Sequence, residues 1–260
     1  MHSIGSIEKA MYRRRRECPI VIPQVDPSNL SITDIEHLFS QIETLGLEFV
    51  AIGGTIIKPQ EIQQVVNLAI KSYKLKCLTY PSNSGVFLID VPAHSCALYW
   101  MSIANAENTF FQRDMLIQNS LSLLSSKLEC IPTVYVFDDR DSVEASHWLS
   151  RAIPVPRHKP YLSLSIALAA QLSGSRFYIM AGGSGCKLIP PIEHIKLIKD
   201  KTSLFLIPTS GIKSAEDANQ IFTAGGDAIH VGKALESTSS DSLLSSLVST
   251  SQKFPGQDFF

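Results

Sequence analysis

Three loops of small residues in the C-terminal part of the chain have the composition of phosphate-binding loops. They are Gly182-Gly183-Ser184-Gly185, Thr209-Ser210-Gly211 and Gly232-Lys233, and each follows a short apolar run. Backbone N–H groups that no Cβ shields can converge on a phosphate, and the positive end of a following helix strengthens the attraction. Because each loop also precedes a helix-like segment, the sequence predicts a strand, a loop and a helix three times over, and a substrate that carries a phosphate.

Two residues with side-chain oxygens follow apolar runs nearer the N-terminus. Asp26 ends Val25-Asp26, and Thr55 ends Gly53-Gly54-Thr55. At the C-terminal end of a barrel strand a carboxylate or hydroxyl would face a ligand, and such hard oxygens suit Mg²⁺. Each residue also has a purely structural interpretation, since Asp26 precedes a proline and the two glycines are typical of a tight turn.

Other side chains leave alternatives open. Tyr178, just before the first small-residue loop, would bond a substrate if it faced the inside of a barrel, and would otherwise be a core aromatic. Aromatic and soft residues further upstream could line a groove for a hydrocarbon chain or belong to the core: Tyr99, Trp100, Met101, Phe110 and Phe111. The histidines show no metal-ligand spacing, and most are expected at surface or capping positions: His37, His147, His194 and His230.

The elements that must position these residues alternate along the chain. Eight apolar runs are expected as strands: 20–25, 49–52, 76–80, 97–101, 133–137, 177–180, 204–207 and 228–231. Segments with helical periodicity separate most of them, at 32–45, 59–73, 110–124 and 161–172. Eight buried parallel strands alternating with helices predict an α/β fold, a (β/α)8 TIM barrel, with an open doubly wound sheet as the alternative.

Length and charge narrow the class of protein. The 260 residues are expected to form one domain, 1–260, with 1–18 as an N-terminal extension or helix. A net charge of −1 argues against nucleic acid as a partner. Five scattered cysteines and the lack of a long apolar run predict a cytoplasmic protein. The run of arginines at 13–16 is expected on a solvated helix, with a targeting or membrane-facing patch as the alternative.

Between Asp26 and Glu236 the chain resembles the geranylgeranylglyceryl phosphate synthase family of barrel prenyltransferases. The longest similar block, 153–186, reads IPVPRHKPYLSLSIALAAQLSGSRFYIMAGGSGC. It is similar to the family's IPRxKP, an Ala-rich helix and YLEAGSGA. Shorter similarities follow the family's order and spacing: Asp26-Pro27, Gly53-Gly54-Thr55, Tyr80-Pro81, Ser102 to Asn108 and Ala224-Gly225-Gly226-Asp227.

The resemblance implies an enzyme that joins the hydroxyl of a phosphorylated three-carbon acceptor to a polyprenyl diphosphate, forming an ether and releasing pyrophosphate. It implies that Asp26 and Thr55 ligand a Mg²⁺ that holds the diphosphate. The acceptor phosphate would be held by Tyr178, also taken as catalytic, and by Ala181, Gly182, Gly183, Ser184, Gly185, Ser210, Gly211, Gly232 and Lys233. The prenyl tail would lie near Tyr80, Tyr99, Met101 and Asn105. A homodimer or higher homo-oligomer and a peripheral membrane contact for the lipid product are further implications.

Three departures from the family pattern bear on the acceptor. The family's glutamate in YLE corresponds to Met180, with one extra glycine in the loop that follows. The family's DPDK reads Asp26-Pro27-Ser28-Asn29, and Lys233 replaces a neutral residue. Losing a carboxylate and gaining a cation predict an acceptor pocket that favours 3-phosphoglycerate, as in the moenomycin-biosynthesis branch of the family, with farnesyl diphosphate or a longer donor. The alternatives are a synthase that uses sn-glycerol 1-phosphate, and a non-catalytic or isomerase-type phosphate-binding barrel.

Overall fold

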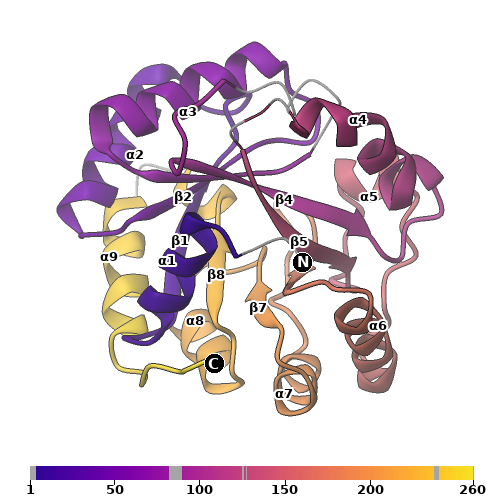
Figure 1. The fold of residues 1–260 in the computed structure, drawn as a ribbon. Helices are drawn as coiled ribbons and strands as arrows, with labels where there is room; N and C mark the ends of the chain where they lie inside the picture. The colour runs from indigo at the N-terminus through magenta and orange to yellow at the C-terminus, as the bar shows by residue number, and fades with distance from the viewer. Residues whose placement is uncertain (1–3, 82–89, 125, 127, 237–239, 260) are drawn as a thin grey trace.

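A computed structural model of the chain shows a barrel of parallel strands with helices around it (Figure 1). The structure describes residues 4–81, 90–124, 126, 128–236 and 240–259. Within them, eight strands form one sheet: β1 (Ile20–Val25), β2 (Phe49–Ile52), β3 (Lys76–Thr79), β4 (Cys96–Ile103), β5 (Glu129–Phe137), β6 (Phe177–Ala181), β7 (Phe205–Pro208) and β8 (Ala228–Val231).

The sheet closes on itself, which confirms the predicted TIM barrel and excludes the open doubly wound sheet. Each strand pairs in parallel with its neighbours in the order β7-β6-β5-β4-β3-β2-β1-β8. The remaining seam, between β7 and β8, is closed by a parallel bridge between Thr209 and His230. The backbone N–H of Asp227 also donates to the carbonyl of Leu206 across this seam, at 2.9 Å.

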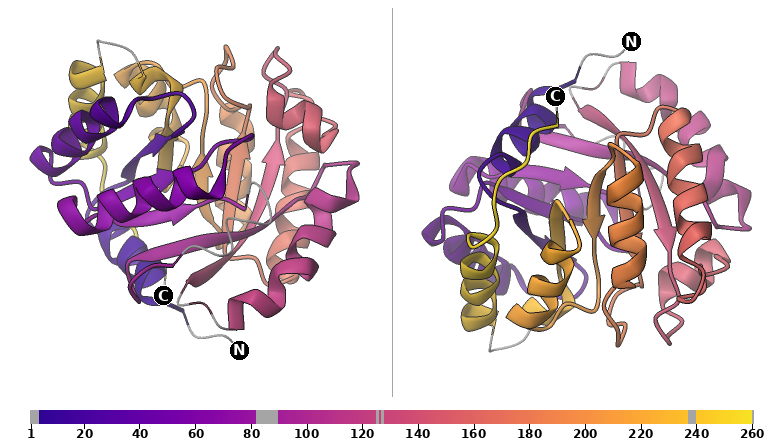
Figure 2. Two further views of the ribbon diagram at one scale, coloured as in Figure 1. Left: turned by 90° about the horizontal axis from the view of Figure 1, so that it is seen from above. Right: turned by 90° about the horizontal axis from the view of Figure 1, so that it is seen from below.

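Helices cover the outside of the barrel (Figure 2). Several begin where the sequence supplies a start signal: Ser31 and Asp34 form a reciprocal capping box, and Pro59 and Pro160 occupy first-turn positions. The described helices are α1 (Ser6–Arg15), α2 (Ile32–Thr44), α3 (Pro59–Tyr73), the π-helix η2 (Phe110–Asp114), α4 (Met115–Leu124), α5 (Ala145–Ser150), α6 (Pro160–Leu172), α7 (Ile192–Lys201), α8 (Ala215–Thr223), the short 3-10 helix η3 (Lys233–Leu235) and α9 (Ser240–Ser251).

Two apolar layers result from the alternation of side chains along each strand. One layer fills the inside of the barrel, and the other lies between the strands and the outer helices. On β6, Phe177 and Ile179 belong to the inner layer, whereas Tyr178 and Met180 belong to the outer layer. This alternation decides which residues of β6 can reach a ligand.

Helix α1 closes the N-terminal end of the barrel. Ile7 and Met11 are fully buried in the inner layer, and the carboxylate of Glu129 accepts from the backbone N–H groups of Ile7 and Glu8, both at 2.8 Å. Arg15 is buried as well, and its Nε donates to Asp227 at 3.1 Å. The expectation that the arginine run is solvated is therefore wrong for Arg15, which holds the helix onto the barrel.

Candidate active site

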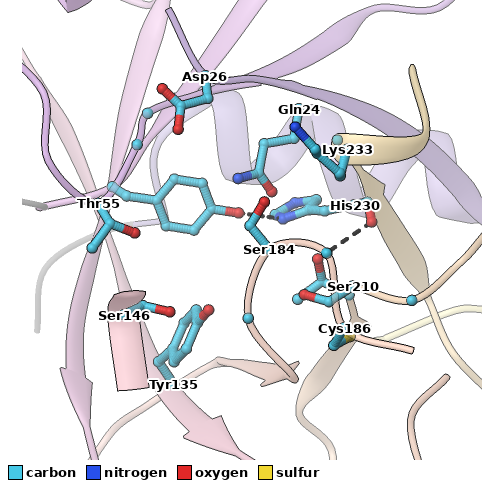
Figure 3. A pocket seen from close by; sticks show the side chains of 18 of the residues that line it. Gln24, Asp26, Thr55, Tyr135, Ser146, Ser184, Cys186, Ser210, His230 and Lys233 are labelled. Carbon is cyan, nitrogen blue, oxygen red and sulfur yellow. Dashed lines mark hydrogen bonds between the residues drawn. The ribbon is translucent and has the colours of Figure 1, made fainter. Parts of the chain in front are cut away.

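A cavity of about 400 Å³ opens at the C-terminal ends of the strands (Figure 3). It gathers residues from both ends of the sequence, as expected for a barrel in which the loops after successive strands share one mouth. Eleven residues predicted for the site line it: Asp26, Thr55, Tyr80, Met101, Gly183, Ser184, Gly185, Ser210, Gly211, Gly232 and Lys233.

The structure places Tyr178 outside this cavity. Its side chain is fully buried in the outer layer, between β6 and the helices. The prediction that Tyr178 binds the acceptor phosphate or acts in catalysis is therefore wrong. The physical reason is the two-residue period of a strand: Tyr178 follows the inward-facing Phe177, so it must point the other way.

Four further predicted residues also lie outside the cavity lining and have structural contacts. Asn105 donates to the carbonyls of Phe137 at 2.8 Å and Ile153 at 2.7 Å, which ties two loops together. Ala181 is buried beside Phe137. Gly182 makes room for the side chain of Arg140, because a Cβ at Gly182 would lie 2.3 Å from its Cδ. Tyr99 lies deeper in the barrel, where its hydroxyl contacts His230.

The orientation of β6 also corrects the correspondence with the family's YLEAGSGA. Placed without an insertion, the motif's GSGA falls on Gly183-Ser184-Gly185-Cys186, so that its tyrosine falls on Ile179 and its glutamate on Ala181. Ile179 faces the inside of the barrel, and Ala181 is buried beside Phe137 at its upper end, whereas Met180 faces the helices. The supposed extra glycine disappears, and the acidic position is occupied by alanine instead of Met180.

Two of the three small-residue loops adopt backbone conformations that glycine favours. Ser210 and Gly211 have φ of +69° and +73°, in the left-handed region. A Cβ at Gly211 would lie 2.2 Å from the carbonyl oxygen of Leu188, so this loop packs directly against the chain that follows the first loop. The prediction that every loop sits at the start of a helix holds only for Gly232-Lys233, which leads into η3. Residues 186–191 and 212–214 separate the other two loops from α7 and α8.

Arg140 braces these loops from below, and the sequence reasoning missed it. Its guanidinium is buried against the carboxylate of Asp138, with Nε to Oδ1 at 2.5 Å and Nη2 to Oδ2 at 2.9 Å. It also donates to the carbonyls of Thr209, of Ser210 at 2.9 Å and of Met180 at 3.1 Å. Burial raises the pKa of Asp138, and Arg140 opposes that shift. The charged run from Asp138 to Asp141 directly follows an apolar strand, and this pattern is the sequence feature that could have marked Arg140 as a site residue.

Asp26 and Thr55 lie on the opposite side of the cavity from the loops after β6 and β7 (Figure 3). Oδ1 of Asp26 accepts from the backbone N–H and the hydroxyl of Ser28, at 3.0 and 2.6 Å. Its carboxylate rests directly over Gly54, where a Cβ would lie 2.4 Å from Oδ1. Among the described hydrogen bonds, Oδ2 has no protein donor, which leaves one carboxylate oxygen for a ligand.

The oxygen atoms on this side of the cavity suit a Mg²⁺ ion that is shared with substrate phosphates and water. They do not form a metal site built from protein ligands alone. The described residues contain no cluster of three or more His, Cys, Asp or Glu side chains arranged for a metal ion. Mg²⁺ is commonly bound through one or two carboxylates together with substrate phosphates and water. Asp26 and Thr55, whose oxygen-bearing side chains line the same cavity, match that pattern.

Lys233 does not add a free positive charge to the cavity. Its Nζ lies 2.6 Å from Oε2 of Glu236, and that hydrogen bond raises the pKa of Lys233. Glu236 also lines the cavity, and its other oxygen accepts from Asn29 at 3.1 Å. The pair therefore contributes no net charge at the mouth of the barrel.

His230 lies in the cavity wall, although the sequence suggested a surface or capping position for most histidines. The side chains of His147, His194 and His230 are all buried, so that expectation is wrong for three of the four. Burial lowers the pKa of His230 to about 3, so its imidazole is neutral near neutral pH. A histidine inside an apolar strand-like run is the signal that could have marked it.

The structure is a closed TIM barrel whose small-residue loops after β6, β7 and β8 share one cavity with the oxygen-bearing side chains after β1 and β2. The sequence matches the PcrB family over residues 10–251, and the chain belongs to that family. This confirms the resemblance found in the motifs and places the chain in a family of prenyltransferases.

Several similar proteins carry the name geranylgeranylglyceryl phosphate synthase. Geranylgeranylglyceryl phosphate synthase of Pyrococcus horikoshii is 29% identical over 238 residues, which are 91% of each chain. The same-named protein of Pyrococcus abyssi is 30% identical over 218 residues, 83% of this chain and 84% of that one. The crystal structure of (S)-3-O-geranylgeranylglyceryl phosphate synthase from Thermoplasma acidophilum, in complex with sn-glycerol-1-phosphate, has the same fold, with a TM-score of 0.86, 24% identity and coverage of 97% of this chain and 100% of that one. No described helix is long and apolar enough to cross a lipid bilayer.

Proposed function

We propose that this protein transfers a polyprenyl group from its diphosphate to the hydroxyl of sn-glycerol 1-phosphate, forming an ether and releasing pyrophosphate. The observation that carries the proposal is the two-sided cavity, with small-residue loops on one side and Asp26 and Thr55 on the other. The names of the relatives and the acceptor present in the Thermoplasma acidophilum complex support the same acceptor for this chain.

The structure changes both arguments that favoured 3-phosphoglycerate, and the lost family carboxylate now corresponds to Ala181 instead of Met180. Met180 faces the outer helices, so its identity cannot set the charge of the acceptor pocket. Lys233 is paired with Glu236, so it supplies no uncompensated cation for a second negative charge on the acceptor. The comparisons favour glycerol 1-phosphate, which was the alternative at the level of the sequence.

The residues divide between the two substrates. The backbone of 183–185, Ser210-Gly211 and Gly232 would hold the acceptor phosphate, and so place its hydroxyl towards the centre of the cavity. Met101, Ile103 and Phe111 provide apolar wall for the first isoprene units and exclude water from the reacting carbon. Asp26 and Thr55 would hold Mg²⁺. When bound, Mg²⁺ neutralises charge on the departing diphosphate.

Product formation with matched acceptors tests the proposal. Purified protein is incubated with Mg²⁺, with farnesyl, geranylgeranyl or a longer radiolabelled prenyl diphosphate, and with one of three acceptors: sn-glycerol 1-phosphate, its enantiomer sn-glycerol 3-phosphate, or 3-phosphoglycerate. We expect an acid-stable prenyl ether with sn-glycerol 1-phosphate at the highest kcat/KM. Product with 3-phosphoglycerate alone would contradict the choice of acceptor.

The same experiment separates catalysis from binding. Tight binding of glycerol 1-phosphate without turnover, for every donor tried, would favour the non-catalytic phosphate-binding protein. A homo-oligomeric state, a peripheral membrane contact and a cytoplasmic location stay predictions from the sequence.

A further inference from the structure

Three polar side chains from three strands form a hydrogen-bonded chain at the base of the cavity. The Tyr99 hydroxyl, on β4, lies 3.0 Å from Nε2 of His230 on β8. The Tyr80 hydroxyl, directly after β3, makes a short hydrogen bond with Nδ1 of the same ring. Tyr80 and His230 line the cavity, and Figure 3 shows His230 on the opposite side of it from Thr55. The proposed function does not yet assign a role to this series of hydrogen bonds.

The number of polar hydrogens on Tyr80, His230 and Tyr99 determines which group donates in each of the two hydrogen bonds. A neutral imidazole has one N–H group and one bare nitrogen, and each tyrosine has one hydroxyl hydrogen. Burial lowers the pKa of His230 and raises the pKa of Tyr80 and of Tyr99, so all three are neutral. Three hydrogens are therefore available for two links, and one of them must point out of the chain at one end.

That end is Tyr80. Tyr99 is completely buried, and in the described part of the protein His230 is the sole hydrogen-bond partner of its hydroxyl. A hydrogen pointing outwards from Tyr99 would lack an acceptor, which is costly in a buried site. Tyr99 thus donates to Nε2, Nδ1–H donates to the Tyr80 oxygen, and the Tyr80 hydrogen is directed into the cavity.

We propose that Tyr80 donates this hydrogen bond to an oxygen of the departing diphosphate, and that Tyr99 and His230 are positioning residues that keep it pointed there. This inference rests on the proposed function. The ring of Tyr80 borders the diphosphate side of the cavity, since a Cβ at Gly53 would lie 3.2 Å from its Cδ2, and its hydroxyl extends from there towards His230. Asn29 stands here where the family's DPDK motif has a lysine.

Tyr80 itself transfers no proton in this step. The bond between the first prenyl carbon and the diphosphate oxygen breaks, and its electron pair leaves with the diphosphate. The acceptor oxygen forms the new ether bond, and its hydroxyl proton passes to the released pyrophosphate. Tyr80 keeps its proton and strengthens its hydrogen bond as negative charge grows on the diphosphate. A fixed donor aimed at a developing charge stabilises the transition state more than the ground state.

Tyr80→Phe tests the donor. Hydrogen bonds to charged groups correspond to roughly 10- to 100-fold effects, so we expect kcat to fall by about that factor, with the KM for glycerol 1-phosphate changed less than about twofold. The matched control is Tyr73→Phe, which removes a hydroxyl bonded to the carbonyl of Glu36 at 3.2 Å, outside the cavity. A Tyr80→Phe protein that folds and keeps kcat within about twofold of wild type would overturn the proposal.

The ¹⁵N NMR signals of His230 show which ring nitrogen carries the proton, and so test the direction of the two hydrogen bonds without any enzymatic turnover. We expect a protonated Nδ1 and a bare Nε2 in the wild-type protein. We expect a shift towards the opposite tautomer in Tyr99→Phe, with a smaller loss of kcat than in Tyr80→Phe. A bare Nδ1 in the wild-type protein would overturn the proposal, because Tyr80 would then donate to His230 and have no hydrogen for the diphosphate.

Binding of magnesium pyrophosphate separates this inference from the proposed function. Calorimetry should show about tenfold weaker binding to Tyr80→Phe than to wild type and to Tyr73→Phe. If wild type forms no ether with any acceptor, the proposed function fails, while the tautomer and the pyrophosphate affinity still decide whether Tyr80 is an anion donor. Equal pyrophosphate affinity in wild type and Tyr80→Phe would count against the donor.

Discussion

Nη1 of Arg140 donates to the main-chain carbonyl of Ser210 at 2.9 Å, which fixes a phosphate-side loop on a buried ion pair. Replacing Arg140 by Met leaves the buried carboxylate of Asp138 without its partner, which costs about 3–5 kcal/mol of unfolding free energy. The loop at Ser210 also loses its brace, so the KM for the acceptor should rise more than the KM for the prenyl diphosphate. Urea unfolding and steady-state kinetics measure the two effects.

The double variant Asp138→Asn with Arg140→Met is the control for that prediction. It removes the uncompensated charge and should recover part of the stability, while the acceptor KM stays raised because the contact with the Ser210 carbonyl is still missing. Full recovery of the acceptor KM in the double variant would show that Arg140 affects the loop only through global stability.

Gly211 can be compared directly with Gly46. Both have positive φ, of +73° and +66°, so alanine at either position meets the same backbone penalty, about 1 kcal/mol. Open space surrounds Gly46, whereas a Cβ at Gly211 would overlap the Leu188 carbonyl. Gly211→Ala should therefore lose more stability than Gly46→Ala and should also raise the acceptor KM. Thermal melts and kinetics on both variants check this, and equal effects would contradict the packing of the loop.

The orientation of β6 predicts different outcomes for two glutamate substitutions. Met180→Glu would place a carboxylate in the apolar layer beneath the helices, so we expect a loss of several kcal/mol of stability and no change in acceptor preference. Ala181→Glu would return the acid to its position in the family motif, and any change in the ratio of kcat/KM between acceptors should appear there. A changed preference in a well-folded Met180→Glu protein would show that our assignment of the strand register is wrong.

Asp26→Asn should remove one of the two ligands expected for Mg²⁺. We expect kcat to fall at least 100-fold and the Mg²⁺ concentration for half-maximal activity to rise, because the amide is a weaker ligand than the carboxylate. Asp200→Asn, at an exposed position on α7, serves as the control. Unchanged Mg²⁺ dependence in Asp26→Asn would move the metal away from this side of the cavity.

His230 should make the protein less stable in acid. Its pKa is lowered from 6.5 to about 3 by burial, so above pH 6.5 both the folded and the unfolded protein hold it neutral and it has no effect. Between pH 6.5 and 3 the unfolded chain binds a proton that the folded chain does not. The free energy of unfolding should therefore fall by about 1.4 kcal/mol per pH unit from this residue. His230→Gln should flatten the pH dependence measured by urea unfolding, whereas exposed His158→Asn should leave it unchanged.

The sequence predicted the architecture because the strands of a closed parallel barrel are apolar on both faces. The bounds of β1, β2 and β8 agree with the apolar runs. The start of β5 was placed too late because Pro132, which interrupts an apolar run, lies inside the strand and pairs with Trp100. The loops and Asp26 were found because their residue types at strand ends are informative in themselves.

The remaining part of the site depends on contacts that no local pattern records. A run such as Tyr178 to Met180 has no polar alternation, so the sequence cannot say which face is inside. Arg140 is distant in sequence from the loop at Ser210 that it braces, and His230 meets Tyr80 and Tyr99 only because the barrel closes. The order of the strands in the sheet creates the first relationship, and the curvature of the sheet into a barrel creates the second.

The contact between the two ends of the described chain has a consequence for the order of folding. The backbone N–H of Gln257 donates to the Arg15 carbonyl at 3.1 Å, and the Phe259 ring packs against Tyr12 and Phe205. Helix α1 is thus held in place by residues that are synthesised more than 240 positions later. During translation, α1 is made long before the C-terminal residues that contact it. Contacts of such long sequence separation form slowly, so we expect the docking of α1 to be a late and slow step of folding. We expect nascent chains that stop before residue 255 to be trapped with the lower end of the barrel open.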